Sequence, residues 1–362
     1  MSNFADVLEI KNGKNQRQVE NPNGKYPIYG SGGVMGYAND FLCEAGTVII
    51  GRKGTINNPI YVNEPFWNVD TAFGLVAKRD ILFPKYLYYF CKKYDFEKLN
   101  TTVTIPSLTK SNLLQIEIPL PPLPIQQKIA DIIDHANTLI EKRKEQIAKL
   151  DLLVKSQFNE MFGNYYSDKT AYKKLKEVCN FIDYRGKTPE KSDDGIPLIT
   201  AKNVKENTFS IEPQEFIPEA NYSNVMTRGI PIHNDVLFTT EAPLGNVCRI
   251  PPIYDRFCVG QRLITMQPIA TVLVSEYLER ALFSQDFRDK MMRRSSGSTV
   301  VGIRSKELIE LTLPMPPLHL QVKYADFVQQ IDKSKFEMQQ GLEKLELLYK
   351  SLMQKCFAGE LF

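Results

Sequence analysis

Long apolar runs are absent from this sequence, which has no uninterrupted stretch near the roughly 18 residues that a membrane helix needs. The N-terminal residues, MSNFADVLEIKNGK, carry an acid and lack the apolar segment of a secretory signal. We therefore expect a cytoplasmic protein with no membrane association.

Histidines are few, and the cysteines are not paired in sequence. The three histidines, His135, His233 and His319, lie in unrelated surroundings, and the six cysteines never fall two or four residues apart. This pattern predicts no metal site and no redox dithiol, and it favours reduced, buried cysteines.

The sequence has no large excess of positive or negative charge. It contains 45 basic and 42 acidic residues, which gives a net charge of +3. Residues 1–117 hold 13 basic and 11 acidic side chains, and residues 164–312 hold 20 and 19. Neither segment has the strongly basic balance of an autonomous nucleic-acid-binding domain. Any nucleic-acid surface must therefore be local, or shared with a partner.

Short catalytic motifs are missing too. An adenine methyltransferase needs a D/N-P-P-Y/F loop, and the nearest string, Asn58-Pro59-Ile60-Tyr61, lacks the second proline. Gly30-Ser31-Gly32-Gly33 does not continue as G-x-G-x-x-G, so it favours a tight hairpin over a phosphate-binding loop. The chain is therefore not expected to be an enzyme by itself.

An internal repeat is the strongest signal in the sequence. Residues 118–162 and 313–357 align without a gap at an offset of 195 residues. Identical pairs include Pro119/Pro314, Gln126/Gln321 and Asp131/Asp326, and a shared K-L-x-L-L-x-K-S string begins at Lys149 and Lys344. Weaker matches, such as Tyr86/Tyr277, extend into the preceding segments. The repeat therefore covers whole domains.

Each repeated segment opens with a proline run and then continues for roughly 35 residues without proline, which predicts a long helix from near Gln126 and from near Gln321. Apolar residues recur in steps of four and three, the heptad pattern of a coiled coil. We expect the two helices to pair antiparallel; the alternative is that each packs separately on its own domain. The expected interface residues are Ile133, Ile140, Ile147, Leu150, Val154, Val328, Met338, Leu342, Leu345 and Tyr349.

The segments before the helices indicate mixed α/β domains. Short strands such as GTVIIGRKG and DVLFTTEAPLG are separated by Gly, Pro, Asn and Asp turns, and one helix and a Ser/Thr-rich loop follow. We therefore expect an α/β (mixed α+β) protein with a pseudo-two-fold internal repeat. Its expected parts are a first domain at 1–117, a first helix at 118–163, a second domain at 164–312 and a second helix at 313–362.

Together these features resemble the DNA-specificity subunit of a Type I restriction-modification system. The resemblance rests on the twin proline, glutamine and lysine segments at Pro119 to Lys128 and Pro314 to Lys323, on the heptad helices and on the C-terminal FAGELF, and it extends end to end. It implies that each mixed domain is a target recognition domain that reads one half of a split DNA sequence. It also implies that the helices act as a ruler and as docking sites for methyltransferase subunits.

The resemblance also implies the partners, which are double-stranded DNA, methyltransferase (modification) subunits and, through the complex, restriction subunits. S-adenosylmethionine, ATP and Mg²⁺ are expected only on those partner subunits, and no cofactor or metal on this chain. The alternatives are the equivalent subunit of a related two-component methyltransferase or restriction enzyme, a coiled-coil adaptor that does not bind DNA, and a stand-alone nuclease or methyltransferase.

Candidate DNA contacts follow from residue chemistry, because recognition domains of this family diverge too far for a transfer by position. Arg and Lys neutralise phosphates, and Arg, Asn and Gln make two-pronged contacts to bases. The candidates, all chosen from predicted turns, are Lys25, Tyr26, Arg52 and Lys53 in the first domain and Arg185, Lys187, Thr188, Lys202, Asn203, Gln261, Arg262, Arg293 and Arg294 in the second. For each, the alternative is a solvated surface residue.

Overall fold

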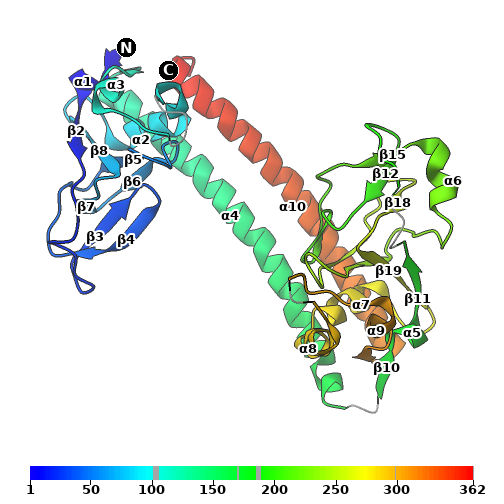
Figure 1. Cartoon of the computed structure of the whole chain (residues 1–362). Helices are drawn as coiled ribbons and strands as arrows, with labels where there is room; N and C mark the ends of the chain where they lie inside the picture. Colours follow the sequence, from blue (N-terminus) through cyan, green and yellow to red (C-terminus); the bar gives the residue numbers. More distant parts are fainter. Residues whose placement is uncertain (101–105, 169–170, 185–188, 298, 362) are drawn as a thin grey trace. The chain divides into compact units, whose positions relative to one another are not determined.

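The computed structural model describes residues 1–100, 106–168, 171–184, 189–297 and 299–361. The chain divides into two compact units, the first comprising residues 1–146 and 338–362 and the second residues 147–337. Each unit contains a mixed α/β globule together with parts of two long helices (Figure 1). Within the described ranges, no helix combines the length and the apolar character needed to cross a membrane.

The first unit is built on a four-stranded antiparallel sheet in the order β2-β8-β5-β6 and a smaller sheet in the order β4-β3-β7. Its strands are β1 (Ser2–Asn3), β2 (Leu8–Asn12), β3 (Tyr26–Gly30), β4 (Gly33–Ala38), β5 (Thr47–Gly51), β6 (Ile60–Val62), β7 (Trp67–Asn68), β8 (Ala72–Ala77) and β9 (Glu117–Ile118). Its short helices are α1 (Phe4–Val7), α2 (Pro84–Lys93), the 3-10 helix η1 (Phe96–Leu99) and α3 (Lys110–Leu114). The expected hairpin at Gly30 to Gly33 joins β3 to β4.

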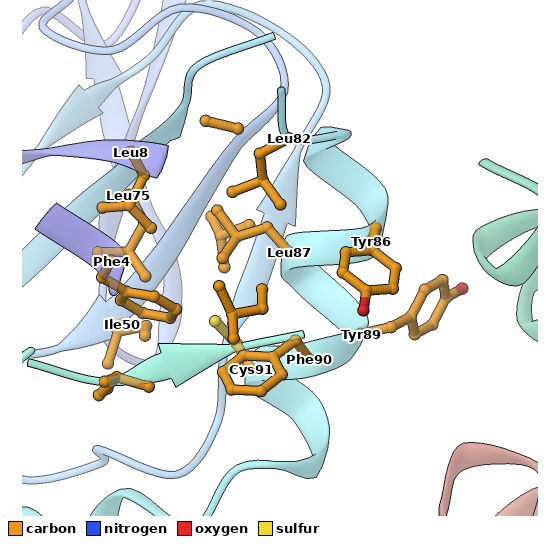
Figure 2. Close-up of a cluster of buried hydrophobic side chains, with 14 of the residues drawn as sticks. Phe4, Leu8, Ile50, Leu75, Leu82, Tyr86, Leu87, Tyr89, Phe90 and Cys91 are labelled. Carbon is orange, nitrogen blue, oxygen red and sulfur yellow. The ribbon is translucent and has the colours of Figure 1, made fainter. Parts of the chain in front are cut away.

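The core of the first unit lies between the larger sheet and α2. Every residue of the central strand β5 is buried, with Ile50 in the main core and Ile49 in a smaller cluster. Figure 2 shows Leu87 and Phe90 of α2 clustered with Ile50 and other sheet residues. A strand that is covered on both faces needs a continuous apolar run, which explains the sequence TVIIG at this position.

The second unit repeats this plan with sheets in the orders β11-β19-β16-β17 and β15-β12-β18. Its strands are β10 (Tyr172–Lys174), β11 (Cys179–Asp183), β12 (Ile196–Ile199), β13 (Val204–Lys205), β14 (Thr208–Phe209), β15 (Phe216–Ile217), β16 (Val236–Thr239), β17 (Val247–Arg249), β18 (Cys258–Val259), β19 (Leu263–Pro268) and β20 (Thr312–Pro314). Its short helices are η2 (Gly163–Tyr166), α5 (Leu175–Val178), η4 (Glu219–Asn221), α6 (Tyr222–Val225), α7 (Ser275–Leu282), α8 (Gln285–Arg294) and α9 (Ser305–Leu308).

Equivalent strands pair in the same order and orientation in the two units. In both, the smaller sheet has one antiparallel pair and one parallel pair, β3 with β7 and β12 with β18. The expected mixed α/β fold with an internal repeat is therefore confirmed. One difference from the sequence prediction is that two helices, α7 and α8, replace the single helix expected before the Ser/Thr-rich loop of the second domain. The Ser284 side chain accepts a hydrogen bond from the Phe287 amide and so begins the second helix.

The two long helices are α4 (Leu123–Phe162) and α10 (Leu318–Ala358). Both begin three residues before the predicted starts: Pro124 lies in the first turn of α4, where its missing N–H is not needed, and α10 begins directly after Pro317. All ten residues expected at the interface are buried or half-buried. Leu152, Leu347 and Leu348 lie outside the heptad pattern and are exposed instead, whereas Phe158 and Phe162, also outside it, are buried in the core of the second unit.

The helices run antiparallel within each unit. In the first unit, Ile129 and Cys356 line the same cavity, and Lys144 forms an ion pair with Glu346 at 3.3 Å. In the second unit, Lys335 pairs with Asp151 at 2.6 Å. The ring of Tyr324 lies 5.5 Å from the rings of both Phe158 and Phe162. Residue numbers therefore rise along α4 as they fall along α10, and the expected antiparallel pairing is confirmed.

A buried glutamine joins each long helix to its globule. Gln126 accepts a hydrogen bond from the Phe83 amide at 2.8 Å and donates to the carbonyls of Ile81 at 2.9 Å and Pro121 at 2.8 Å. In the second unit, Gln321 makes the same three contacts with Val274, Val272 and Pro316. The sequence identity of these two glutamines thus reflects a shared structural role.

Candidate nucleic-acid interface

Four loops of the first unit meet where strand β5 ends. We call this site the first loop cluster, and it comprises Ser31, Gly32, Arg52, Lys53, Gly54, Asp70, Thr71 and Ser107. The Arg52 amide donates to the Thr71 carbonyl at 2.8 Å, and the Arg52 carbonyl accepts from the Leu108 amide at 2.9 Å. A Cβ atom on Gly51 would lie 3.0 Å from the Cβ of Ser31, so the tip of the β3–β4 hairpin is also adjacent.

The cationic side chains of the first loop cluster are exposed. Arg52 and Lys53 directly follow β5, and both are open to solvent. The Arg52 guanidinium lies over the Phe73 ring at 5.7 Å, which fixes its direction without neutralising its charge. Gly54 has φ of +80°, and nothing lies within 4 Å of a Cβ placed there. This surface can therefore approach an extended anionic partner closely.

The second unit forms the same cluster from equivalent loops. This second loop cluster comprises Thr200, Lys202, Thr240, Glu241, Gln261, Arg262 and Gly302. The Thr240 amide donates to the Arg262 carbonyl at 2.9 Å, and the Thr240 carbonyl accepts from the Ile303 amide at 3.0 Å. Thr240 therefore takes the place of Arg52, and Arg262 takes the place of Thr71. The isolated bridges Lys53–Ser107 and Glu241–Gly302 correspond in the same way.

Two hollows flank Gln261 and Arg262. The larger, of about 480 Å³, also has Lys191, Lys202 and Lys205 in its lining. The smaller, of about 320 Å³, is lined in part by Ser296 and Arg304. The dipeptide Gln261-Arg262 thus forms a ridge with hydrogen-bond donors, and basic side chains surround it.

Two acidic residues organise the charges of the second loop cluster. Glu215 pairs with Lys191 at 2.7 Å and with Lys202 at 3.0 Å. Burial disfavours its ionised form, but the hydrogen bonds from these two lysines hold the pKa of the Glu215 carboxyl below its ordinary value. Glu241 forms an ion pair with Nε of Arg262 at 3.2 Å. The basic side chains of this surface are therefore partly fixed in direction before any ligand binds.

The structure groups five of the thirteen candidates in these clusters, namely Arg52, Lys53, Lys202, Gln261 and Arg262. Lys25 and Tyr26 lie at the opposite end of β3, where the Tyr26 ring packs 4.9 Å from Phe41. Arg293 and Arg294 end α8 shortly before Ser296, and Arg294 pairs with Glu307 at 3.3 Å. Arg185, Lys187 and Thr188 lie outside the described residues.

Asn203 requires a correction. Its side chain is 4% exposed, so it is not available for a base contact. Its Oδ1 accepts from the Thr200 amide at 2.9 Å, and its Nδ2 donates to the carbonyls of Ser210 at 3.0 Å and Pro213 at 3.1 Å. These bonds satisfy the buried amide by holding the turn after β12, a role that asparagine often has.

Sequence reasoning missed Lys191, Lys205 and Glu241. All three lie close to predicted strands, but nothing in their sequence neighbourhood marks them. Only the pairing of β12 with β18 and of β16 with β19 brings them beside Arg262. Over the described ranges, no group of three His, Cys, Asp or Glu side chains is arranged to hold a metal ion.

Comparisons of the sequence and of the fold with known proteins point to the same family. The profile of the Type I restriction modification DNA specificity domain matches residues 1–150 and 167–347. The Type I restriction enzyme MjaVIII specificity subunit of Methanocaldococcus jannaschii is 24% identical over 342 residues, which is 88% of this chain and 77% of that one.

Two solved structures share the fold. The S subunit of a Type-I restriction-modification system from M. genitalium has a TM-score of 0.61 at 19% identity, over 98% of this chain and 95% of that chain. A chain of the type I R-M system, from a structure that addresses complex assembly and conformational transition, has a TM-score of 0.54 at 18% identity, over 99% and 97%. Because the matched profile spans both repeats and most of the sequence, the chain belongs to the family of Type I restriction-modification DNA-specificity subunits.

Proposed function

We propose that this chain recognises a split DNA target and that each loop cluster faces one half-site. The observation that carries the proposal is the equivalence of the two clusters. Each is built from the same loops of its unit, and each exposes arginine and lysine side chains beside backbone turns. Such side chains neutralise phosphates, and Arg and Gln make two-pronged contacts to base edges. A protein that reads two half-sites with two copies of one fold needs equivalent surfaces of this kind.

The near-neutral charge of the chain fits recognition within an assembly. The basic residues exceed the acidic ones by only three over the whole sequence. Affinity for DNA grows with the number of phosphates that a protein neutralises. A subunit with so small an excess supplies specificity, and we propose that methyltransferase subunits on the same duplex supply most of the electrostatic affinity.

The long helices carry a candidate docking surface for those subunits. The repeated leucine pairs Leu152-Leu153 and Leu347-Leu348 are exposed, one pair in each unit. An exposed apolar patch that recurs at equivalent positions favours two equivalent contacts with partner subunits. Restriction subunits would then join through the methyltransferase subunits.

Catalysis belongs to the partner subunits, because the family is that of a specificity subunit. We propose that S-adenosylmethionine, ATP and Mg²⁺ bind those partners and that this chain holds none of them. The loop clusters offer hydrogen-bond donors and positive charge for DNA.

The test is a mobility-shift assay of this chain with its methyltransferase subunits on a library of duplexes. We expect one split sequence to be selected. Replacing Arg52 and Lys53 with alanine should weaken binding or relax the half-site of the first unit, whereas replacing the exposed Lys92, which lies over the Tyr88 ring, should do neither. A complex without sequence preference would indicate a coiled-coil adaptor and refute the proposal.

A further inference from the structure

Arg262 has an unusual backbone for an arginine. Its φ is 65°, in the left-handed region that side chains with a Cβ atom rarely adopt. Four described residues other than glycine share a positive φ, and two of them are asparagines, which tolerate it. The other two, Ala242 and Arg262, line the same 480 Å³ hollow. Strained backbone of this kind gathers at functional sites.

The Arg262 side chain is exposed, but an ion pair favours one orientation of its guanidinium. It is 57% exposed, and its Nε forms an ion pair with the Glu241 carboxylate at 3.2 Å. A two-pronged contact to guanine O6 and N7 can use the two terminal nitrogens of a guanidinium. The Glu241 carboxylate thus orients the guanidinium through Nε. The edge that carries the two terminal nitrogens is directed away from this ion pair.

A base contact suits this arrangement better than a phosphate contact. A carboxylate next to a phosphate-binding arginine would repel the phosphate, whereas hydrogen bonding to a base edge needs direction more than net charge. The exposed Lys205 lines the same hollow and can take up a phosphate, whereas Lys191 and Lys202 are paired with the Glu215 carboxylate. Arg262 is therefore better suited to a base contact.

We propose that Arg262 reads a guanine in the half-site of the second unit and that Glu241 is a positioning residue for its guanidinium. This inference rests on the proposed function and deepens it, because it assigns one base of the target to one side chain. It also explains why an arginine is found where glycine would fit the backbone without strain.

The experiment uses the complex of the full chain with its methyltransferase subunits. Variants R262K, R262G and E241Q are compared with the wild type in duplex binding and in the methylated motif in cells. R262K keeps the positive charge but loses the two-pronged contact, so one G·C position of one half-site should lose roughly 5- to 150-fold of its discrimination. The other half-site should not change.

The remaining variants separate readout from folding. R262G removes both the side chain and the backbone strain, so it should relax the same position while its melting temperature is maintained or raised. E241Q should relax that position less than R262K does. The matched control is R256K, because Arg256 is an exposed arginine that pairs with Glu219 at 3.2 Å away from both hollows. We expect its motif to equal that of the wild type.

Different failures have different meanings. An unchanged motif in R262K and R262G would overturn the assignment of Arg262 and leave the proposed function intact. A uniform loss of affinity at every position would also overturn it, because that result is typical of a phosphate contact. If R262G does not fold, R262K decides. A wild-type complex without any sequence preference would instead refute the proposed function itself.

Discussion

Replacing Gln126 with leucine should detach the first globule from its long helix. The Gln126 side chain is fully buried, and it makes three hydrogen bonds of 2.8 to 2.9 Å to main-chain groups. Leucine has a similar size but cannot make any of them. The substitution therefore leaves the Phe83 amide and two carbonyls buried without partners.

The magnitude follows from these orphaned groups. An unsatisfied buried donor or acceptor costs about 1–3 kcal/mol, so three of them, with partial relaxation, should destabilise the first unit by about 3–5 kcal/mol. Replacing Gln321 should cost the second unit a similar amount, because its three contacts are equivalent. The adjacent exposed residue, Gln127, gives a matched control that should stay within about 0.5 kcal/mol of the wild type.

Hydrogen exchange suits this measurement better than a single melting curve, because a chain with two compact units need not unfold in one step. Gln126→Leu should lower the protection of the amides around Phe83, and Gln321→Leu that of the amides around Val274. If Gln126→Leu cost no more than the Gln127 control, the buried hydrogen bonds would not be what holds the helix to the globule. That result would refute the reasoning.

Three further perturbations test other parts of the chain. Arg249→Met removes a half-buried cation that pairs with the buried Glu279 at 2.8 Å and should cost about 3–5 kcal/mol. Burial raises the pKa of the Glu279 carboxyl, and Arg249 partly offsets this effect. Without Arg249 the pKa rises further above that of the unfolded chain, so ionised Glu279 destabilises the fold more. Urea unfolding should therefore show a larger loss in the free energy of unfolding at pH 8 than at pH 5.5. Exchanging residues 172–312 for another recognition domain should change only one half of the methylated sequence, and changes in both halves would contradict independent reading. Inserting four residues after Lys149 and four after Lys344 adds about 6 Å to each helix and should lengthen the gap between the half-sites by one or two base pairs, whereas an unaltered gap with normal activity would mean that the helices do not set it.

The sequence alone was sufficient to predict the repeat and the paired helices, because each depends on a regular pattern. The heptad spacing identified Ile133, Ile140 and Leu342, which are all buried. Helix starts were less accurate, since a proline such as Pro124 can lie inside the first helical turn as well as before it. The extra helix α8 escaped prediction because a single cap, Ser284, decides where it begins.

The candidate interface could be predicted only in part. Residue type and neighbouring glycines identified Arg52, and turn composition identified Gln261 and Arg262. The same reasoning also selected Asn203, because a turn asparagine that holds its own loop looks no different in sequence from one that contacts a base. The match between the two clusters was not predictable, because Arg52 corresponds to Thr240, and Arg262 to Thr71, through backbone hydrogen bonds alone.

This contrast explains why the repeat is clear in one part of the chain and invisible in another. Gln126 and Gln321 hold the fold with their side chains, so the identity of the residue matters at both positions. In the loop clusters the connecting hydrogen bonds join main-chain atoms, from Arg52 to Thr71 and from Thr240 to Arg262. Side chains other than proline, which lacks an N–H, can occupy positions 52 and 240 without loss of those bonds. The fold therefore leaves the residues of each loop cluster free to vary, which is what a pair of domains needs if each is to read a different sequence on one common scaffold.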